Sequence, residues 1–299
     1  MPVSASEASL APIVCCFDYR YVLPFCVLLE SLAESHVGLV DELQVFAVHE
    51  DLPPSAMARI DAHATRLGIR VDFRRTEPVD NRFPTDGPQP GQFTRAVYLR
   101  LMLGNVLSDV RRVLYLDADL IVLRDLRALL SLPLNGRALG AVRDPIQPTL
   151  EQGYALPGWR DEGIPGDREY FNSGVLLFDL DECRKQKFFE RAVSFLEKFP
   201  ERAACLDQDA LNWVANDAWI RLDSQWNTIN AQTFIWYFGM DIVADPSSAG
   251  AVDLLLQQES EASILHYAGR QKPWHDDCPE SNSRALYHRF LNYVLENEN

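Results

Sequence analysis

Two acidic residues, separated by one alanine, follow an apolar run in the middle of the chain. Asp117 and Asp119 come directly after the strand-like residues 112–116, and a second apolar run, 120–123, follows them. In an extended chain alternate side chains point to the same side, so the two carboxylates can share one cation while Ala118 points away. Two unpaired carboxylates would repel each other, and a divalent metal bound to a diphosphate would neutralise them. A surface turn is the alternative, and the flanking apolar runs favour the metal site.

A second polar cluster lies near the end of the chain, directly after the strand-like residues 263–265. His266 can complete a metal shell as a neutral imidazole. Gly269 allows the backbone to approach a phosphate closely, and Lys272 offers an ammonium to a departing diphosphate oxygen. A packed turn that carries a core or surface histidine is the alternative for this segment.

These residues must be positioned by the elements around them. Apolar strand-like segments alternate with helical patterns through the first half of the chain, which predicts an α/β fold with a mostly parallel central sheet flanked by helices. In such sheets ligands bind outside the carboxyl ends of the strands, where Asp117 and Asp119 are expected. The predicted strands are 13–16, 43–48, 70–73, 112–116 and 175–178, and the predicted helices are 23–35, 55–67, 94–104, 181–199, 207–215 and 283–296. Loops rich in Gly and Pro are expected at 77–93 and 145–168.

Composition restricts the class of protein. The chain has 299 residues, 47% of them hydrophobic, which suits one elaborated globular domain. Its 43 Asp and Glu against 28 Lys and Arg give a net charge of −15, so we expect no nucleic-acid partner. Any phosphate site must therefore be local and assisted by a metal.

The cysteines and the chain start indicate the compartment. Six cysteines occur without a C-x-x-C pair, which favours reduced structural thiols. The first twelve residues contain no Lys or Arg, and no apolar stretch reaches the roughly 18 residues that a membrane-spanning helix needs. We expect a cytoplasmic protein, at most peripherally associated with the inner membrane face.

The chain resembles glycosyltransferase family 8, the retaining GT-A enzymes that include lipopolysaccharide galactosyl- and glucosyltransferases and glycogenin. The matching segments follow the family's order: 112–119 (Arg-Val-Leu-Tyr-Leu-Asp-Ala-Asp), 170–177 (Tyr-Phe-Asn-Ser-Gly-Val-Leu-Leu), 207–212 (Asp-Gln-Asp-Ala-Leu-Asn) and 266–275 (His-Tyr-Ala-Gly-Arg-Gln-Lys-Pro-Trp-His). The resemblance implies one GT-A domain over 1–299, a Rossmann-like nucleotide-sugar-binding fold. Its nucleotide-sugar half would span 11–145, its acceptor and metal-completing half 146–280, and its C-terminal helix 283–296.

The resemblance also implies a cofactor and substrates. Asp117, Asp119 and His266 would hold Mn²⁺, with Mg²⁺ as the alternative, because a mixed oxygen and nitrogen shell suits manganese better. The donor would be UDP-galactose or UDP-glucose, and the acceptor a saccharide or glycolipid. The residues that would contact the donor are Arg100, Ala118, Asp119, Asp144, Asn172, Gly269 and Lys272. The alternatives to donor binding are structural roles. Arg100 would lie on a helix surface, Asp144 would lie in a turn, and Asn172 would be a buried polar residue.

The end of the first strand departs from the family pattern. Asp18 can accept a hydrogen bond from uracil, and Tyr21 can stack near the base. Arg20 stands where the family usually has an asparagine, so this position gives no argument for uracil. Uridine is implied by the resemblance as a whole.

Gln208 occupies the family's position on the sugar face opposite the leaving group. A neutral amide there favours front-face attack through an oxocarbenium-like ion pair, while the adjacent Asp207 keeps double displacement open. In both mechanisms Lys272 and the metal would stabilise charge on the leaving diphosphate.

Two other functions stay open. A haloacid-dehalogenase-type phosphatase also has a D-x-D after a strand, but normally near the start of its domain. A non-catalytic UDP-sugar-binding protein could keep the pocket without turnover, although such a protein would not need Lys272 beside a complete metal shell. The acceptor site would be built from the loops 145–168 and 230–253, whose conformations cannot be derived from the sequence.

Overall fold

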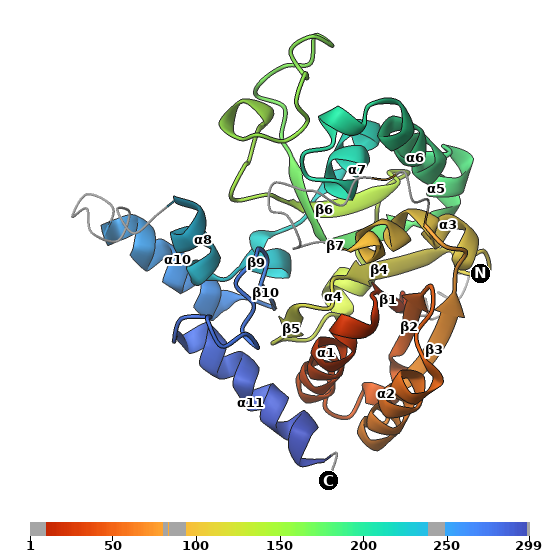
Figure 1. The fold of residues 1–299 in the computed structure, drawn as a ribbon, viewed down its shortest axis with the longest axis vertical. Coiled ribbons are helices and arrows are strands. Elements are labelled where there is room, and N and C mark those ends of the chain that lie inside the picture. Colours follow the sequence, from red (N-terminus) through yellow and green to blue (C-terminus); the bar gives the residue numbers. More distant parts are fainter. Residues whose placement is uncertain (1–9, 80–82, 84–93, 239–248, 298–299) are drawn as a thin grey trace, which may run out of the picture.

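A seven-stranded sheet forms the centre of the molecule (Figure 1). The computed structural model describes residues 10–79, 83, 94–238 and 249–297. The strand order is β3-β2-β1-β4-β7-β6-β8. Its strands are β1 (Ile13–Cys16), β2 (Gln44–His49), β3 (Arg70–Arg75), β4 (Arg112–Leu116), β6 (Leu139–Arg143), β7 (Phe171–Asp179) and β8 (Ile220–Arg221). Only β7 runs antiparallel to its neighbours, β4 and β6, so the predicted α/β fold with a mostly parallel sheet is confirmed.

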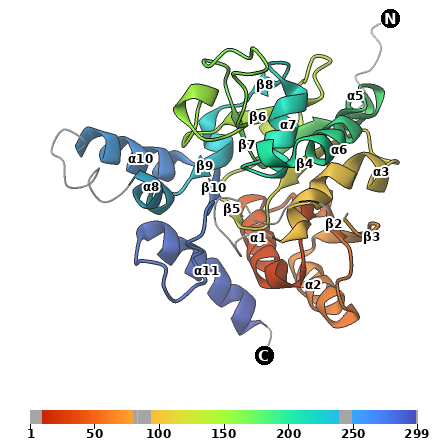
Figure 2. The same cartoon turned by 45° about the horizontal axis from the view of Figure 1, so that its top comes forward.

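Helices cover both faces of this sheet, as the alternation along β1 shows. Ile13 and Cys15 pack in one core cluster with residues of α1, α2 and α11, whereas Val14 and Cys16 pack in a second cluster with residues of α5, α6 and α7. Figure 2 shows the two groups of helices on opposite sides of the sheet. The helices of the first group are α1 (Val22–Ser35), α2 (Pro54–Leu67) and α11 (Asn282–Glu296). Those of the second are α5 (Leu180–Lys185), α6 (Phe188–Lys198) and α7 (Asp207–Ala215).

A smaller, three-stranded sheet joins distant parts of the chain. Its strands are β5 (Leu120–Val122), β9 (Thr228–Ile229) and β10 (Ile264–His266). β10 pairs antiparallel with β5, and the register places His266 opposite Leu120. The backbone N–H of Tyr267 donates to the carbonyl of Asp119 at 3.0 Å. This pairing brings the C-terminal polar cluster beside the acidic pair.

Two predicted helices differ from the structure. Residues 94–104 form a 3-10 helix, η3 (Arg95–Met102), followed by the short α3 (Leu103–Val106). A 3-10 helix has three residues per turn, so Tyr98 and Leu101 lie on the same side of η3, and both are buried.

The predicted helix 181–199 is two helices, α5 and α6, because Lys187 between them adopts a left-handed conformation with φ of 51°. The break lets both Phe188 and Phe189 pack against Phe178, at ring-centroid distances of 6.5 and 5.3 Å. Aromatic packing overrides a continuous helical pattern here.

The remaining elements are short or peripheral. As the sequence predicts, α2 has a proline in its first turn and ends at Gly68, whose φ is 77°. The predicted loop 77–93 lies mostly outside the described residues. The other helices are α4 (Arg127–Leu130), α8 (Ala231–Phe238) and α10 (Ala249–Glu261), with 3-10 turns η1 (Tyr19–Tyr21), η2 (Val40–Glu42), η4 (Leu150–Gln152), η5 (Pro200–Arg202) and η6 (Ser224–Asn227).

All six cysteines lie in the described part of the chain, and none of them forms a disulfide. Among the described residues, no helix is both long enough and apolar enough to cross a bilayer.

Candidate active site

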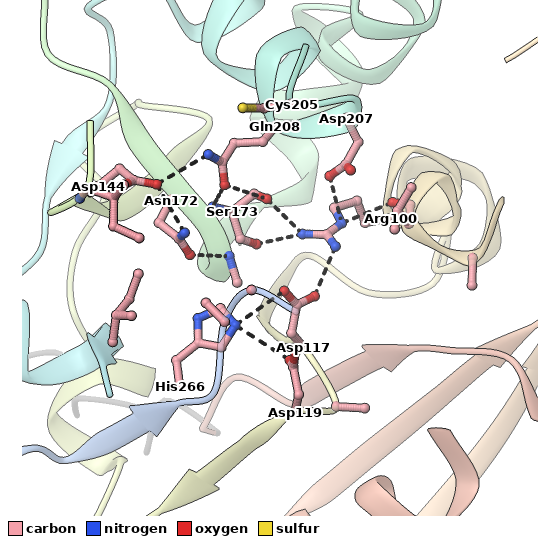
Figure 3. A pocket seen from close by; sticks show the side chains of 18 of the residues that line it. Arg100, Asp117, Asp119, Asp144, Asn172, Ser173, Cys205, Asp207, Gln208 and His266 are labelled. Carbon is pink, nitrogen blue, oxygen red and sulfur yellow. Dashed lines mark hydrogen bonds and ion pairs between the residues drawn. The ribbon is translucent and has the colours of Figure 1, made fainter. Parts of the chain in front are cut away.

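A cavity opens where the carboxyl ends of β1 and β4 face β7 and β10 (Figure 3). The backbone N–H of Asp117, just after β4, donates to the carbonyl of Gly174 in β7 at 2.9 Å. The adjoining β5–β10 pair then supplies His266 from the opposite side. The predicted site residues that line the cavity are Tyr21, Arg100, Asp117, Ala118, Asp119, Asp144, Asn172, Asp207, Gln208, His266, Gly269 and Lys272.

Asp117, Asp119 and His266 each offer one ligand atom to a common point. These atoms lie within 4.8 Å of one another. Nε2 of His266 is 3.5 Å from Oδ1 of Asp119 and 3.9 Å from Oδ2 of Asp117. Both distances exceed the range of a hydrogen bond, and two carboxylate oxygens with one imidazole nitrogen form a donor set for a divalent transition metal.

The second oxygen of each carboxylate is already bonded to a cation. Oδ1 of Asp117 accepts from Nη2 of Arg100 at 2.9 Å and from the Tyr115 hydroxyl. Oδ2 of Asp119 accepts from Nζ of Lys272, which also donates to the Tyr267 carbonyl at 2.8 Å. These partners leave Oδ2 of Asp117 and Oδ1 of Asp119 facing His266, so each carboxylate presents a single oxygen to the metal position.

The ion pair of Asp119 with Lys272 keeps both groups charged. Burial opposes ionisation of Asp119, but Lys272 and His266 outweigh burial and lower the pKa of this carboxyl. Burial likewise opposes protonation of Lys272, and Asp119 outweighs it, so the pKa of Lys272 is raised. Lys272 therefore carries a positive charge inside the cavity.

Arg100 is buried, so the helix-surface alternative for this residue is wrong. Its Nε lies 3.0 Å from Oδ2 of Asp207, and its Nη1 donates to the Ser173 carbonyl at 2.7 Å. Burial raises the pKa of Asp207 to about 6, and Arg100 opposes that shift. The guanidinium thus links Asp117 and Asp207 across the cavity, as the dashed lines in Figure 3 show.

Both ends of the Gln208 amide are bonded. Its Oε1 accepts from the Ser173 backbone N–H at 2.8 Å, and its Nε2 donates to Oδ2 of Asp144 at 3.3 Å. Asp144 also accepts from Nδ2 of Asn172 at 3.2 Å, and burial raises the pKa of Asp144. Gln208, Asp144 and Asn172 therefore form one hydrogen-bonded group on the cavity wall.

The residues predicted for uracil are split between two places. Tyr21 lines the main cavity and contacts Trp274 edge-on, with ring centroids 5.8 Å apart. Asp18 borders a neighbouring hollow, and its Oδ1 accepts from the Arg20 backbone N–H at 2.9 Å. Gly269 lines the main cavity with a φ of 82°, a left-handed conformation that favours glycine.

Sequence reasoning missed four residues that shape the site. Tyr115, Ser173 and Gly174 lie within matched segments, but their contacts depend on the fold. A Cβ at Gly174 would lie 2.3 Å from Cε1 of His266, so only glycine leaves room for that ring. Asn227, which bonds His266, lies in no matched segment and gave no signal.

The chain has relatives of known class. The sequence profile of Glycosyl transferase family 8 matches residues 12–278. This protein belongs to glycosyltransferase family 8. General stress protein A of Bacillus subtilis is 25% identical over 289 residues, which cover 95% of this chain and 94% of that protein.

Two further comparisons connect the family 8 chain to sugar transfer. The lipopolysaccharide 1,2-glucosyltransferase of Escherichia coli is 32% identical over 184 residues, which cover 61% of this chain and 50% of that protein. A crystal structure of the galactosyltransferase LgtC in complex with donor and acceptor sugar analogs superposes with a TM-score of 0.75 at 25% identity, covering 94% of this chain and 95% of that one. Family membership and the GT-A-type fold remove the phosphatase alternative.

Proposed function

We propose that this family 8 glycosyltransferase moves a hexose from a UDP-sugar to a saccharide or another hydroxyl acceptor, with retention of anomeric configuration and dependence on Mn²⁺. The observation that carries the proposal is the convergence of Asp117, Asp119 and His266 on one point in a cavity that also holds Lys272. LgtC is a galactosyltransferase and the Escherichia coli relative is a glucosyltransferase, which supports galactose and glucose as candidate hexoses.

The metal position suits Mn²⁺ by its donor set. Asp117 and Asp119 supply hard oxygens, and His266 supplies a borderline nitrogen, a mixture that suits manganese better than Mg²⁺ or Ca²⁺. A bound divalent ion would neutralise negative charge on the diphosphate leaving group.

The polar walls of the cavity favour front-face attack. Oδ2 of Asp207 lies 3.0 Å from Nε of Arg100, so this oxygen is directed at the guanidinium and not at an attacking position on the sugar. Gln208 is neutral and held at both ends by Ser173 and Asp144, so it can line the sugar face without forming a covalent bond. Lys272 would meanwhile hold the departing phosphate oxygen by charge.

Two aromatic residues support a saccharide acceptor. Tyr154, from the loop 145–168, and Tyr237, from α8, both line the cavity. Aromatic faces are common contacts for sugar rings. The segment 230–253, expected as a loop, instead contains α8 and the start of α10, and residues 239–248 between them lie outside the described residues.

A panel of UDP-hexoses tests this function directly. We expect UDP release with Mn²⁺ that is fastest with UDP-galactose or UDP-glucose, is abolished by chelation and is restored by added Mn²⁺. NMR of the product should show the α-anomer of the donor retained. Tight binding of UDP-sugars without transfer or hydrolysis, in the presence of a range of sugar acceptors, would instead identify a non-catalytic sugar-nucleotide-binding protein.

Replacing Lys272 with methionine should lower kcat on the order of 10²–10³-fold, as when one preorganised charge-stabilising donor is lost. Mn²⁺ affinity in the same variant should not fall, because Asp119 loses only a competing cation. Steady-state kinetics and Mn²⁺ titration together separate the two effects. Lys185→Met, which removes an exposed lysine paired with Glu182, is the control. An unchanged kcat in the Lys272 variant would contradict the role of this ammonium.

A further inference from the structure

A continuous series of hydrogen bonds leads away from the side of His266 that does not face the carboxylates. We propose that Asn227 is a positioning residue that holds the imidazole proton on Nδ1, so that Nε2 keeps its lone pair for the cation. Asn227 lies at the end of η6, outside the cavity wall, and is 2% exposed. The inference rests on the proposed metal site and assigns a role to a side chain that would not touch metal or substrate.

The direction of every bond follows from one backbone group. The N–H of Gly174 can only donate, and it points to Oδ1 of Asn172 at 2.9 Å. This contact identifies the oxygen end of the Asn172 amide. The same oxygen is 2.8 Å from Asn227, so the atom of Asn227 that meets it must be the donor, Nδ2.

The orientation of Asn227 then decides the protonation of His266. With Nδ2 directed at Asn172, the remaining amide atom of Asn227, Oδ1, lies 2.9 Å from Nδ1 of His266. An amide oxygen has no proton to donate, so Nδ1 of the ring must carry one. In a neutral imidazole the other nitrogen is then an acceptor, and Nε2 is the atom that faces Asp117 and Asp119.

The series ends on a carboxylate, which gives it a uniform direction. Nδ2 of Asn172 donates to Oδ2 of Asp144 at 3.2 Å. Each donor from His266 through Asn227 and Asn172 therefore points toward Asp144. Hydrogen bonds aligned in one direction polarise one another, and a negative end draws protons along the series. The series therefore connects Asp144, which is proposed to contact the sugar, to the metal ligand His266.

Burial makes alternative arrangements costly. Asn172 is 8% exposed and His266 is 4% exposed, so neither side chain can easily exchange its partner for bulk water. If the His266 proton moved to Nε2, Nδ1 of His266 would become an acceptor. It would then face another acceptor, Oδ1 of Asn227, at 2.9 Å. Opposed buried acceptors at this distance are unfavourable. An unprotonated Nε2 also faces carboxylate oxygens, but at 3.5 and 3.9 Å, so the shorter contact with Asn227 selects the tautomer.

The test uses the metal-free protein first. Long-range ¹H–¹⁵N NMR of histidine-labelled protein, at a pH where the ring is neutral, distinguishes a protonated ring nitrogen from an unprotonated one. We expect His266 of the unmodified protein to show a protonated Nδ1 and an unprotonated Nε2. A protonated Nε2 in this sample would overturn the proposal, whatever the activity of the enzyme.

Variants of Asn227 then test the consequence for metal binding. Asn227→Ala should give a mixture of the two tautomers and a Mn²⁺ affinity about 10–100-fold weaker by electron paramagnetic resonance titration, as for other groups that orient a metal-ligating histidine. Asn227→Asp keeps an acceptor for the Nδ1 proton and should keep the single tautomer, whereas its second oxygen would oppose Oδ1 of Asn172 and should lower the free energy of unfolding. Equal Mn²⁺ affinity in Asn227→Ala and the unmodified protein would contradict the proposal.

Asn212→Ala is the control for a purely structural effect. Asn212 is 1% exposed and bonds the backbone of Phe171 through both ends of its amide, but it is not part of the series. This variant should lose stability without changing the His266 tautomer. Failure of the unmodified protein to bind Mn²⁺ would overturn the proposed metal site, and the NMR measurement would still decide where His266 carries its proton.

Discussion

Replacing Asp119 with asparagine is expected to lower Mn²⁺-dependent sugar transfer by about 10³-fold or more. The change removes one of two negative charges at the metal position and leaves a neutral amide facing His266. Metal ions contribute several kcal/mol of charge stabilisation in such reactions, and each 1.36 kcal/mol is about tenfold in rate. UDP release measured at saturating UDP-hexose, across a range of Mn²⁺ concentrations, would report both kcat and metal affinity.

The effect should be specific to this carboxylate. Asp61→Asn, an equal change of charge on the exposed face of α2, should leave transfer unchanged. Because Lys272 loses its partner in Asp119→Asn, thermal unfolding must be followed in parallel. Full activity in a folded Asp119→Asn protein would show that the metal, if required, binds elsewhere.

Replacing Gly174 with alanine is expected to remove most of the Mn²⁺ binding, although glycine has no side chain that could bind a metal. The added Cβ would lie 2.3 Å from Cε1 and 2.7 Å from Nδ1 of His266, distances that real atoms do not adopt. The imidazole must move away from Asp117 and Asp119, and loss of this ligand should weaken Mn²⁺ affinity more than the 10–100-fold typical of a supporting residue. Electron paramagnetic resonance titration measures the change.

A matched control separates crowding at the metal position from crowding in general. Gly104→Ala places a Cβ 2.9 Å from the Phe189 ring, in the core and away from the cavity. Both variants should lose about 1–3 kcal/mol of stability by overpacking, and only Gly174→Ala should lose the metal. A Gly174→Ala protein that binds Mn²⁺ normally would mean that His266 is not a ligand.

The elements that sequence reasoning predicted well are those with strong local signals. The strands β1, β2, β3 and β4 are apolar or alternating runs, and α2 has both its proline start and its glycine stop. The small sheet was not predicted as a unit, because β9 has only two residues and β5 and β10 three each. Strands of this length form through pairing with distant partners, which a local pattern does not contain. The break at Lys187 was missed for a similar reason, since packing on Phe178 decides it.

The candidate site also has features that the sequence predicts and features that depend on the fold. Asp117, Asp119 and His266 could be predicted because their types are typical metal ligands and lie in segments that resemble a family. Which oxygen of each carboxylate stays free could not be predicted, since it depends on contacts with Arg100 and Lys272.

Asn227 was unpredictable because its importance comes only from a hydrogen bond across 39 residues of sequence to His266. Its neighbours in the sequence carry no pattern that indicates a metal site. Residues that orient a ligand become visible only when the fold brings them to it.

Diffraction from a crystal grown with UDP and Mn²⁺, measured at the manganese absorption edge, tests the central claim most directly. The structure predicts one anomalous peak within coordination distance of Oδ2 of Asp117, Oδ1 of Asp119 and Nε2 of His266, with the diphosphate oxygens on its open side. A manganese peak away from these three atoms, or UDP bound in the cavity with no metal beside it, would contradict the account.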